Sequence, residues 1–356
     1  MTYSYSKATA YHRPHAVEQS HKRSSEMYVG TQYGARHETD IKQLAQLGVH
    51  HVDVPLREHW TDWTVDLLVS YREKYAKYGI EVETIHSPLG SRDAFSNDMT
   101  YLFLGPSDEK ERELDSLCEI IRMASQAGLR GLLYNITILG HLRTPQRYGR
   151  GGARLSSFKY ADLDQSLPDF EGGAADYDTM WERIDYFLGR IIPVAEEYKV
   201  QMACHPQDPG IKDNEYRGVA RVMGTVEGLK KFEAMHENPY HGFNFCQGTV
   251  SEMLEKPGEE IYDVIRYFGT RKKIFNVHPR HHPGGKCGVT MQSKAKSVED
   301  YLSDLDDTRR EAISTVRDIV LDNLPDGYEE MMLFGMITYA VPLSIFPDTY
   351  NKQPLM

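Results

Sequence analysis

Short apolar runs alternate along this chain with segments that are apolar at every third or fourth position. The apolar runs predict buried strands of a parallel sheet, and the segments between them predict amphipathic helices that cover it. The seven predicted strands are Met27–Gln32, His50–Pro55, Ile80–His86, Gly131–Ile136, Val200–His205, Gly242–Cys246 and Lys273–His278.

The helical segments fall between these strands in regular order. They are Glu38–Leu47, Thr61–Tyr78, Lys110–Ala127, Tyr177–Tyr198, Thr225–Glu237 and Pro257–Phe268. This order, without an internal linker, predicts an α/β fold: a single (β/α)8 TIM barrel with a long loop, Thr137–Asp176, after strand 4. We expect residues 1–26 to form a polar N-terminal arm and residues 27–356 to form the barrel domain.

The C-terminal end of the predicted barrel is irregular. A long charged helix is expected at Ser297–Leu324, followed by an apolar segment at Met331–Phe346 that should hold the eighth strand. Pro342 interrupts that segment, and little chain remains for an eighth helix. Two alternatives remain for what packs against this side of the barrel: the N-terminal arm, or a partner subunit in a homo-oligomer.

Composition narrows the class of protein. With 40% hydrophobic and 26% charged residues in 356, the chain reads as a soluble globular protein with ample core. The net charge of −11 argues against nucleic acid or an anionic membrane as the main partner. We find no apolar run long enough for a membrane span, no secretory signal and no CxxC spacing among the cysteines, which favours the cytoplasm.

Three metal-ligating side chains each close a predicted strand: His205, Cys246 and His278, separated by 41 and 32 residues. In a barrel of parallel strands such positions meet at the C-terminal mouth, where active sites lie. Two imidazoles and a thiolate there predict a divalent-metal site that suits Mn²⁺, Fe²⁺, Co²⁺ or Zn²⁺. The alternative is three unrelated residues that satisfy ordinary packing.

Alternation along the strands places each donor on the same face as a small or polar residue. Asn244 shares the face of Cys246, and Asn276 shares the face of His278, as expected for a polar barrel interior. Cys204 falls on the opposite face from His205 and is expected to pack against the outer helices.

The long loop carries several arginines among glycines. Arg143, Arg150 and Arg154 are candidates for clamping a substrate carboxylate in bidentate fashion. A solvated, flexible loop is the competing interpretation. Asn135, near the end of strand four, is a further candidate for binding substrate.

Acid–base candidates lie at other strand ends. His281 follows the last predicted ligand and has a near-neutral ordinary pKa, although an exposed polar turn is the alternative there. Arg280, beside it, is a candidate for binding the carboxylate. His86 ends strand three, and Tyr134 could supply a phenol near the end of strand four.

At these residues the chain resembles the mannonate dehydratase family, within the xylose-isomerase-like barrel superfamily. The resemblance runs from about Tyr134 to Arg280. The shared elements are Tyr134-Asn135, Leu142-Arg-Thr to Gly149-Arg-Gly-Gly-Ala-Arg154, Ile192-Pro-Val-Ala-Glu-Glu197, Cys204-His-Pro-Gln-Asp-Pro209, Tyr216-Arg-Gly-Val-Ala-Arg221, Phe245-Cys-Gln-Gly-Thr249 and Ile274-Phe-Asn-Val-His278.

The resemblance implies that His205, Cys246 and His278 bind a divalent metal, usually manganese, and that the chain removes water from a sugar acid. The C2 proton would leave first, and a His or Tyr acid would protonate the departing C3 hydroxyl. The family takes a fourth ligand from an Asp followed by His. Here the counterpart is Asp348, followed by Thr349, and Glu329 and Glu330 are rival ligands.

We therefore expect a metal-dependent sugar-acid dehydratase, a carbon–oxygen lyase. The alternatives are a metal-dependent sugar isomerase, epimerase or keto-sugar eliminase of the same superfamily, and a non-catalytic sugar-binding barrel. The metal ligands do not separate the first two, because both reactions begin by removing a proton next to a carbonyl.

Overall fold

The computed structural model describes most of the chain between residues 28 and 348. The described residues are 28–32, 34–35, 37–148, 154–211, 215–278, 295–305, 307–333, 336–348 and 354. The predicted N-terminal arm, residues 1–26, lies outside them, and the division into an arm and one barrel domain stays a prediction.

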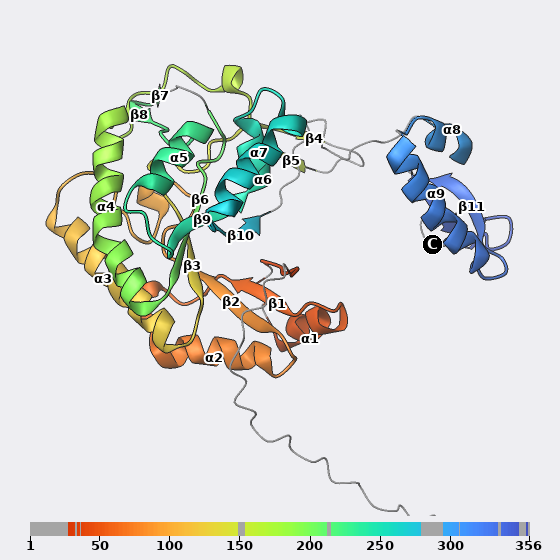
Figure 1. The fold of residues 1–356 in the computed structure, drawn as a ribbon, viewed down its shortest axis with the longest axis horizontal. Helices are drawn as coiled ribbons and strands as arrows, with labels where there is room; N and C mark the ends of the chain where they lie inside the picture. Colours follow the sequence, from red (N-terminus) through yellow and green to blue (C-terminus); the bar gives the residue numbers. More distant parts are fainter. Residues whose placement is uncertain are drawn as a thin grey trace, which may run out of the picture.

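A parallel sheet of six strands, which curls as half of a barrel, forms the centre of the fold (Figure 1). Neighbouring strands pair in the order β1-β2-β3-β6-β9-β10, so the sheet runs through the chain without a reversal. The strands are β1 (His51–Val54), β2 (Glu81–His86), β3 (Gly131–Asn135), β6 (Gln201–His205), β9 (His241–Cys246) and β10 (Ile274–His278). The predicted α/β barrel-type fold is confirmed, and six of the seven predicted strands appear within a few residues of their expected limits.

The first predicted strand appears in reduced form. Thr31 makes an isolated parallel bridge with Val52, in which its N–H donates to the carbonyl of His51 and its carbonyl accepts from Asp53. These bonds cover part of the free edge of β1. Met27, at the predicted start of that strand, lies outside the described residues.

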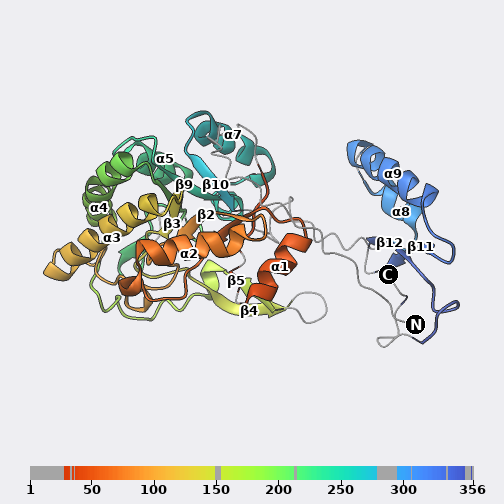
Figure 2. The same ribbon diagram turned by 90° about the horizontal axis from the view of Figure 1, so that it is seen from below.

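Helices follow the strands and cover the outer side of the sheet. Figure 2 shows α2, α3 and α4 running along it. They are α1 (Glu38–Gln46), α2 (Val65–Ala76), α3 (Asp108–Gln126), α4 (Tyr177–Tyr198), α5 (Val226–Ala234), α6 (Gln247–Glu252) and α7 (Pro257–Thr270). Among the described helices, none is long and apolar enough to span a bilayer.

Helix limits follow from local chemistry. Ser107 caps α3 by accepting a hydrogen bond from the backbone of Lys110, and Asp176 caps α4 in the same way. The apolar positions of α3 recur at helical spacing and are fully buried at Leu114, Leu117 and Ile121. Each such helix therefore presents one apolar face to the sheet.

The long loop after β3 carries a small antiparallel hairpin of β4 (Thr144–Tyr148) and β5 (Arg154–Ser157). A second pair, β7 (Glu215–Tyr216) and β8 (Val219–Ala220), follows β6. Both pairs lie in connections that leave the C-terminal ends of the sheet strands, so they belong to the side of the barrel where the predicted donors lie.

The predicted eighth barrel strand is wrong. The segment expected to contain it forms part of a separate antiparallel hairpin, β11 (Glu329–Leu333) with β12 (Met336–Ala340), and neither strand pairs with the six-stranded sheet. Pairing across a short turn costs less loop-closure entropy than joining a distant sheet edge. The single helix expected before it is divided into α8 (Val298–Ser303) and α9 (Asp307–Asp322).

A chain of polar side chains links strands across the inner side of the curled sheet. The Asn276 amide on β10 donates to the Asp53 carboxylate on β1 at 3.1 Å and to the Asn244 carbonyl oxygen at 3.1 Å. Thr84 on β2 donates to the other Asp53 oxygen at 2.5 Å. The predicted polar interior is confirmed at Asn244 and Asn276, and these bonds bring the two ends of the sheet together below the donor trio.

His241, the first residue of β9, is fully buried between the sheet and α5. Its Nε2 lies 2.8 Å from the carbonyl oxygen of Phe232, so Nε2 carries the proton that is donated. Burial lowers the pKa of His241 from 6.5 to about 4. Between these pH values the unfolded chain binds more protons than the folded protein, so the free energy of unfolding must fall as the pH falls.

We expect the substitution His241→Gln to reduce this pH dependence. A histidine whose pKa is lowered from 6.5 to about 4 destabilises the folded state by about 3 kcal/mol once the pH lies below both pKa values. Urea unfolding of metal-free wild type and variant between pH 7 and pH 4 measures the difference. Equal slopes for the two proteins would show that His241 titrates normally.

Candidate metal centre and active site

The three predicted donors converge at the C-terminal ends of adjacent strands. One ligand atom from each of His205, Cys246 and His278 lies within 4.8 Å of the other two. Strand register explains the meeting: His278 pairs with Cys246 across β10 and β9, and His205 ends the next strand, β6. Strand-end donors on consecutive strands therefore share one point above the sheet, as the spacing predicts.

Hydrogen bonding fixes which nitrogen of His205 faces the group. Its Nδ1 lies 2.7 Å from the carbonyl oxygen of Pro206, which accepts the Nδ1 proton. The unprotonated Nε2 then faces His278, whose Nδ1 lies 3.3 Å away. A backbone carbonyl that orients the imidazole in this way is typical of metal-ligating histidines.

The surroundings of the Cys246 side chain favour its thiolate form. Burial alone would raise its pKa, but the adjacent imidazoles of His205 and His278, when protonated, hydrogen bond to the sulfur and outweigh that effect, which lowers the pKa from 9.0 to about 5. The Thr249 hydroxyl also donates to the sulfur at 3.1 Å. A thiolate and two imidazoles form a donor set that suits a divalent transition metal, so the residues present fit such an ion.

His86 lies at the same edge, at the end of β2. Burial, together with the positive charge of His278 when protonated, lowers its pKa from 6.5 to about 4. Its Nε2 is buried and has no hydrogen-bond partner among the described residues. The predicted acid–base candidate at this position is therefore a neutral imidazole beside the trio, with one nitrogen available to a ligand.

A buried carboxylate that the sequence reading passed over organises the loop after His205. Asp208 is 1% exposed and accepts two hydrogen bonds from Arg143, at 3.0 and 2.8 Å. His141 Nδ1 lies 3.5 Å from the same carboxylate, and its ring packs against His205 at 5.4 Å between centroids. Asp208 lies three residues after the predicted ligand His205, and this closeness in the sequence is the feature that could have indicated a role at the site.

This contact changes the role expected of Arg143. The guanidinium also donates to Ser156 Oγ at 2.8 Å and to the Leu142 carbonyl at 2.7 Å, so most of its N–H groups are used within the protein. Arg143 clamps the carboxylate of Asp208, whereas the sequence predicted that it clamps a substrate. It joins the loop that follows His205 to the β4–β5 hairpin.

Tyr134 lies on the other side of the sheet. It is 1% exposed, and its ring packs against Phe187 of α4 at 5.8 Å. Register pairs Tyr134 with Cys204, while the next pair is Asn135 with His205. Alternation therefore turns Tyr134 and Cys204 toward the helices, and we correct the expectation that Tyr134 faces the site. The expected burial of Cys204 is confirmed.

Asn135 lies in register with His205 and anchors the loop after β2. Its backbone N–H and its side-chain amide both donate to the carbonyl of Leu89, at 2.9 and 3.3 Å. The residue is thus at the expected edge, where its side-chain carbonyl oxygen remains an acceptor for a ligand.

The remaining predicted site residues either lie outside the described residues or do not belong to the donor trio. Arg150, Arg280 and His281 lie outside the described residues, and Arg154 is described only as the start of β5. Asp348 is exposed and is not part of the donor group of the described residues. Glu330 on β11 accepts hydrogen bonds from both Nε and Nη2 of Arg317 on α9, so that rival fourth ligand is held in an ion pair between β11 and α9.

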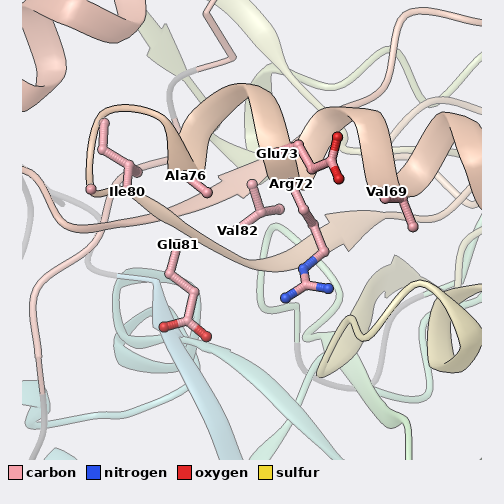
Figure 3. Close-up of a pocket in the computed structure, with 8 residues that line it drawn as sticks. Val69, Arg72, Glu73, Ala76, Ile80, Glu81 and Val82 are labelled. Atoms are coloured by element: carbon pink, nitrogen blue, oxygen red, sulfur yellow. The ribbon is translucent and has the colours of Figure 1, made fainter. Parts of the chain in front are cut away.

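Two cavities lie at opposite ends of the strands. Figure 3 shows one, between α2 and the start of β2, with Arg72, Ala76 and Val82 among its lining residues. It is remote from the trio, because the donors lie at the strand ends and Glu81 begins β2. The second is formed by the loops after β2 and β3 and is lined in part by His141 and Arg143, so it adjoins the site.

Comparison with known proteins gives a consistent result. The family model for D-mannonate dehydratase (UxuA) matches residues 155–286, a range that contains all three donors. The mannonate dehydratase of Thermotoga petrophila is 26% identical over 288 residues, which cover 70% of this chain and 75% of that protein. That of Geobacillus thermodenitrificans is 26% identical over 252 residues, 62% of this chain and 64% of that protein.

A solved structure supports the fold. The crystal structure of mannonate dehydratase from Streptococcus suis serotype 2 superposes with a TM-score of 0.58 at 19% identity, covering 70% of this chain and 71% of that one. The sequence matches and the shared barrel fold agree with the resemblance carried by the motifs around the three donors. The chain is similar in sequence to mannonate dehydratases at about a quarter identity and shares the barrel-type fold of one of them.

Proposed function

We propose that this chain is a metal-dependent sugar-acid dehydratase, a hydro-lyase that eliminates water from an aldonate-type substrate. The observation that carries the proposal is the convergence of His205, Cys246 and His278, with ligand atoms within 4.8 Å of one another, at the end of the barrel where this fold places its chemistry. The similarity to mannonate dehydratases supports the reaction class.

The three donors would hold one divalent ion through His205 Nε2, a nitrogen of His278 and the Cys246 sulfur. Mn²⁺ is our first choice because the family uses it, and the thiolate keeps Fe²⁺, Co²⁺ and Zn²⁺ as alternatives. When bound, the metal supplies Lewis acidity toward substrate oxygens. Asp348 stays our proposed fourth ligand.

The reaction breaks the C2–H and C3–O bonds, forms a C2=C3 double bond and releases water; the resulting enol rearranges to a 2-keto-3-deoxy acid. His86 Nε2, buried and without a partner among the described residues, is our candidate for holding the C2 proton. His281 stays the candidate for protonating the C3 hydroxyl. Asn135 offers its side-chain carbonyl oxygen to a substrate hydroxyl, and Arg280 stays a proposed carboxylate ligand.

The dehydration assay is the direct test. We expect chelator-treated protein to be inactive on D-mannonate, and expect stoichiometric Mn²⁺ to restore formation of the 2-keto-3-deoxy acid, measured by its colour reaction after periodate cleavage. A panel of other aldonates runs in parallel, because the stereochemistry of the substrate is not specified by the donors.

Other outcomes point to the competing functions. A fully metal-loaded protein that forms no keto-deoxy acid contradicts the dehydratase. If it then interconverts keto sugars, the isomerase or epimerase alternative holds. A protein that binds no stoichiometric metal supports a non-catalytic sugar-binding barrel. A cytoplasmic location and assembly into a homo-oligomer stay proposals, which localisation of a tagged chain and sedimentation would check.

A further inference from the structure

The cavity beside the trio is built from two loops that hydrogen bond to each other. The loop after β2 and the loop after β3 form an antiparallel bridge between Asp93 and Leu139. The Ala94 N–H donates to the Ile138 carbonyl and the His141 N–H donates to the Ser91 carbonyl, both at 2.8 Å. The cavity floor is therefore fixed by the backbone.

Gly140 makes this close approach feasible. Its φ is +73°, and a Cβ placed there would lie 2.6 Å from the backbone nitrogen of Asp93. Any larger residue would separate the two loops. The buried Arg221 guanidinium donates to the Gly140 carbonyl at 3.3 Å, a further contact that holds this part of the loop.

The cavity wall offers hydrogen-bonding groups that the protein itself uses little. Arg92 donates one long bond, 3.4 Å, to the Ser96 carbonyl and has no carboxylate partner among the described residues. Among the described residues, the hydroxyls of Ser91 and Ser96 have no hydrogen-bond partner. Asp93 also lines the cavity, and its carboxylate accepts from the Ser96 backbone at 3.2 Å.

His141 joins this cavity to the donor trio. It lines the cavity, and its ring packs against the ring of His205. At about 440 Å³ the cavity is in the size range of small-molecule sites. A ligand seated there would extend from the trio toward Arg92. Arg143, on the same wall, is already committed to Asp208.

We infer that Arg92 is a further residue that binds the carboxylate of the sugar acid, and that Ser91 and Ser96 bind its hydroxyls. This inference rests on the proposed function for its substrate class. Arg92 offers the donors that the sequence had assigned to Arg143, and a guanidinium that has no carboxylate partner among the described residues matches a substrate carboxylate in both charge and geometry.

The test compares an anionic ligand with its neutral counterpart. Binding of D-mannonate and D-mannitol to Mn²⁺-loaded wild type, Arg92→Gln and Arg92→Lys is measured by calorimetry, with further aldonate–alditol pairs if mannonate does not bind. Arg112→Gln is the matched control, because Arg112 is an exposed arginine paired with Glu109 on α3. Melting temperatures confirm that each variant is folded.

We expect Arg92→Gln to weaken aldonate binding by about 10- to 100-fold, the usual loss for a charge-assisted hydrogen bond, and to leave alditol binding within about threefold. Arg92→Lys should recover part of the loss, and Arg112→Gln should change neither ligand. In turnover, KM should rise while kcat changes little.

Three results would overturn the inference: unchanged aldonate binding in Arg92→Gln, an equal loss for aldonate and alditol, or no aldonate of the panel binding to wild type. The proposed reaction fails separately. Aldonate binding that depends on Arg92 without any elimination retains the inference and rejects the dehydratase, whereas elimination that is insensitive to Arg92 does the reverse.

Discussion

Replacing Cys246 by alanine is expected to abolish stoichiometric binding of a divalent metal and to lower turnover by roughly 10³-fold or more. The thiolate is the one anionic donor of the trio, and Lewis-acid catalysis contributes several kcal/mol in metal-dependent enzymes. Elemental analysis after gel filtration measures the metal, and the dehydration assay measures the turnover.

A matched cysteine variant separates this effect from general damage. Cys118 is a buried free thiol on α3, and Cys118→Ala should keep both metal and activity. Loading with Co²⁺ adds an independent signal, because a cobalt–thiolate bond gives a ligand-to-metal absorption that only proteins with Cys246 should show. Full metal content in Cys246→Ala would exclude this residue as a ligand.

Replacing Arg143 by glutamine is expected to lower the free energy of unfolding by about 3 kcal/mol. The change leaves the Asp208 carboxylate, which is 1% exposed, without its bidentate partner, and removing one member of a buried pair usually costs about 3–5 kcal/mol. We expect the lower end, because the Arg143 side chain is 29% exposed. Urea unfolding with a constant m-value measures the loss.

The double variant Arg143→Gln, Asp208→Asn identifies the cause. If the stability lost in the single variant comes from an unpaired buried charge, removing that charge should restore part of it, and a double-mutant cycle gives the coupling between the two residues. A single variant as stable as wild type would show that water or His141 satisfies Asp208. Because the pair anchors the loop after His205, metal affinity should fall in Arg143→Gln even where the protein remains folded.

The donor trio shows how far local pattern reaches. Each donor closes an apolar run, and parallel strands place their C-terminal ends together whatever the details of packing. The same rule of alternation that placed Asn244 and Asn276 inside the barrel also turns Tyr134 outward with Cys204, so the wrong expectation for Tyr134 was open to correction from strand register.

Other parts of the site depend on contacts between distant segments. Arg143 and Asp208 are 65 residues apart, and nothing in the glycine-rich loop indicates which carboxylate its arginine meets. Arg92 and His141 come together through a β-bridge between two loops, and no hydrophobic periodicity in the sequence predicts that bridge. The apolar segment near the C-terminus has the composition of a barrel strand, but β12 within it pairs with β11 and not with the six-stranded sheet.

The sequence by itself determined the barrel-type fold, the positions of six sheet strands in order, and the three donors at one end, because hydrophobic periodicity and strand-end placement are local properties of the chain. Only the tertiary structure decided that Arg143 is held by Asp208, that Tyr134 faces the helices, and that Arg92 lines a cavity beside His141. Those outcomes depend on which of many possible long-range contacts buries charged groups and apolar surface with the lowest free energy. Spacing along the chain does not reveal which contact that is.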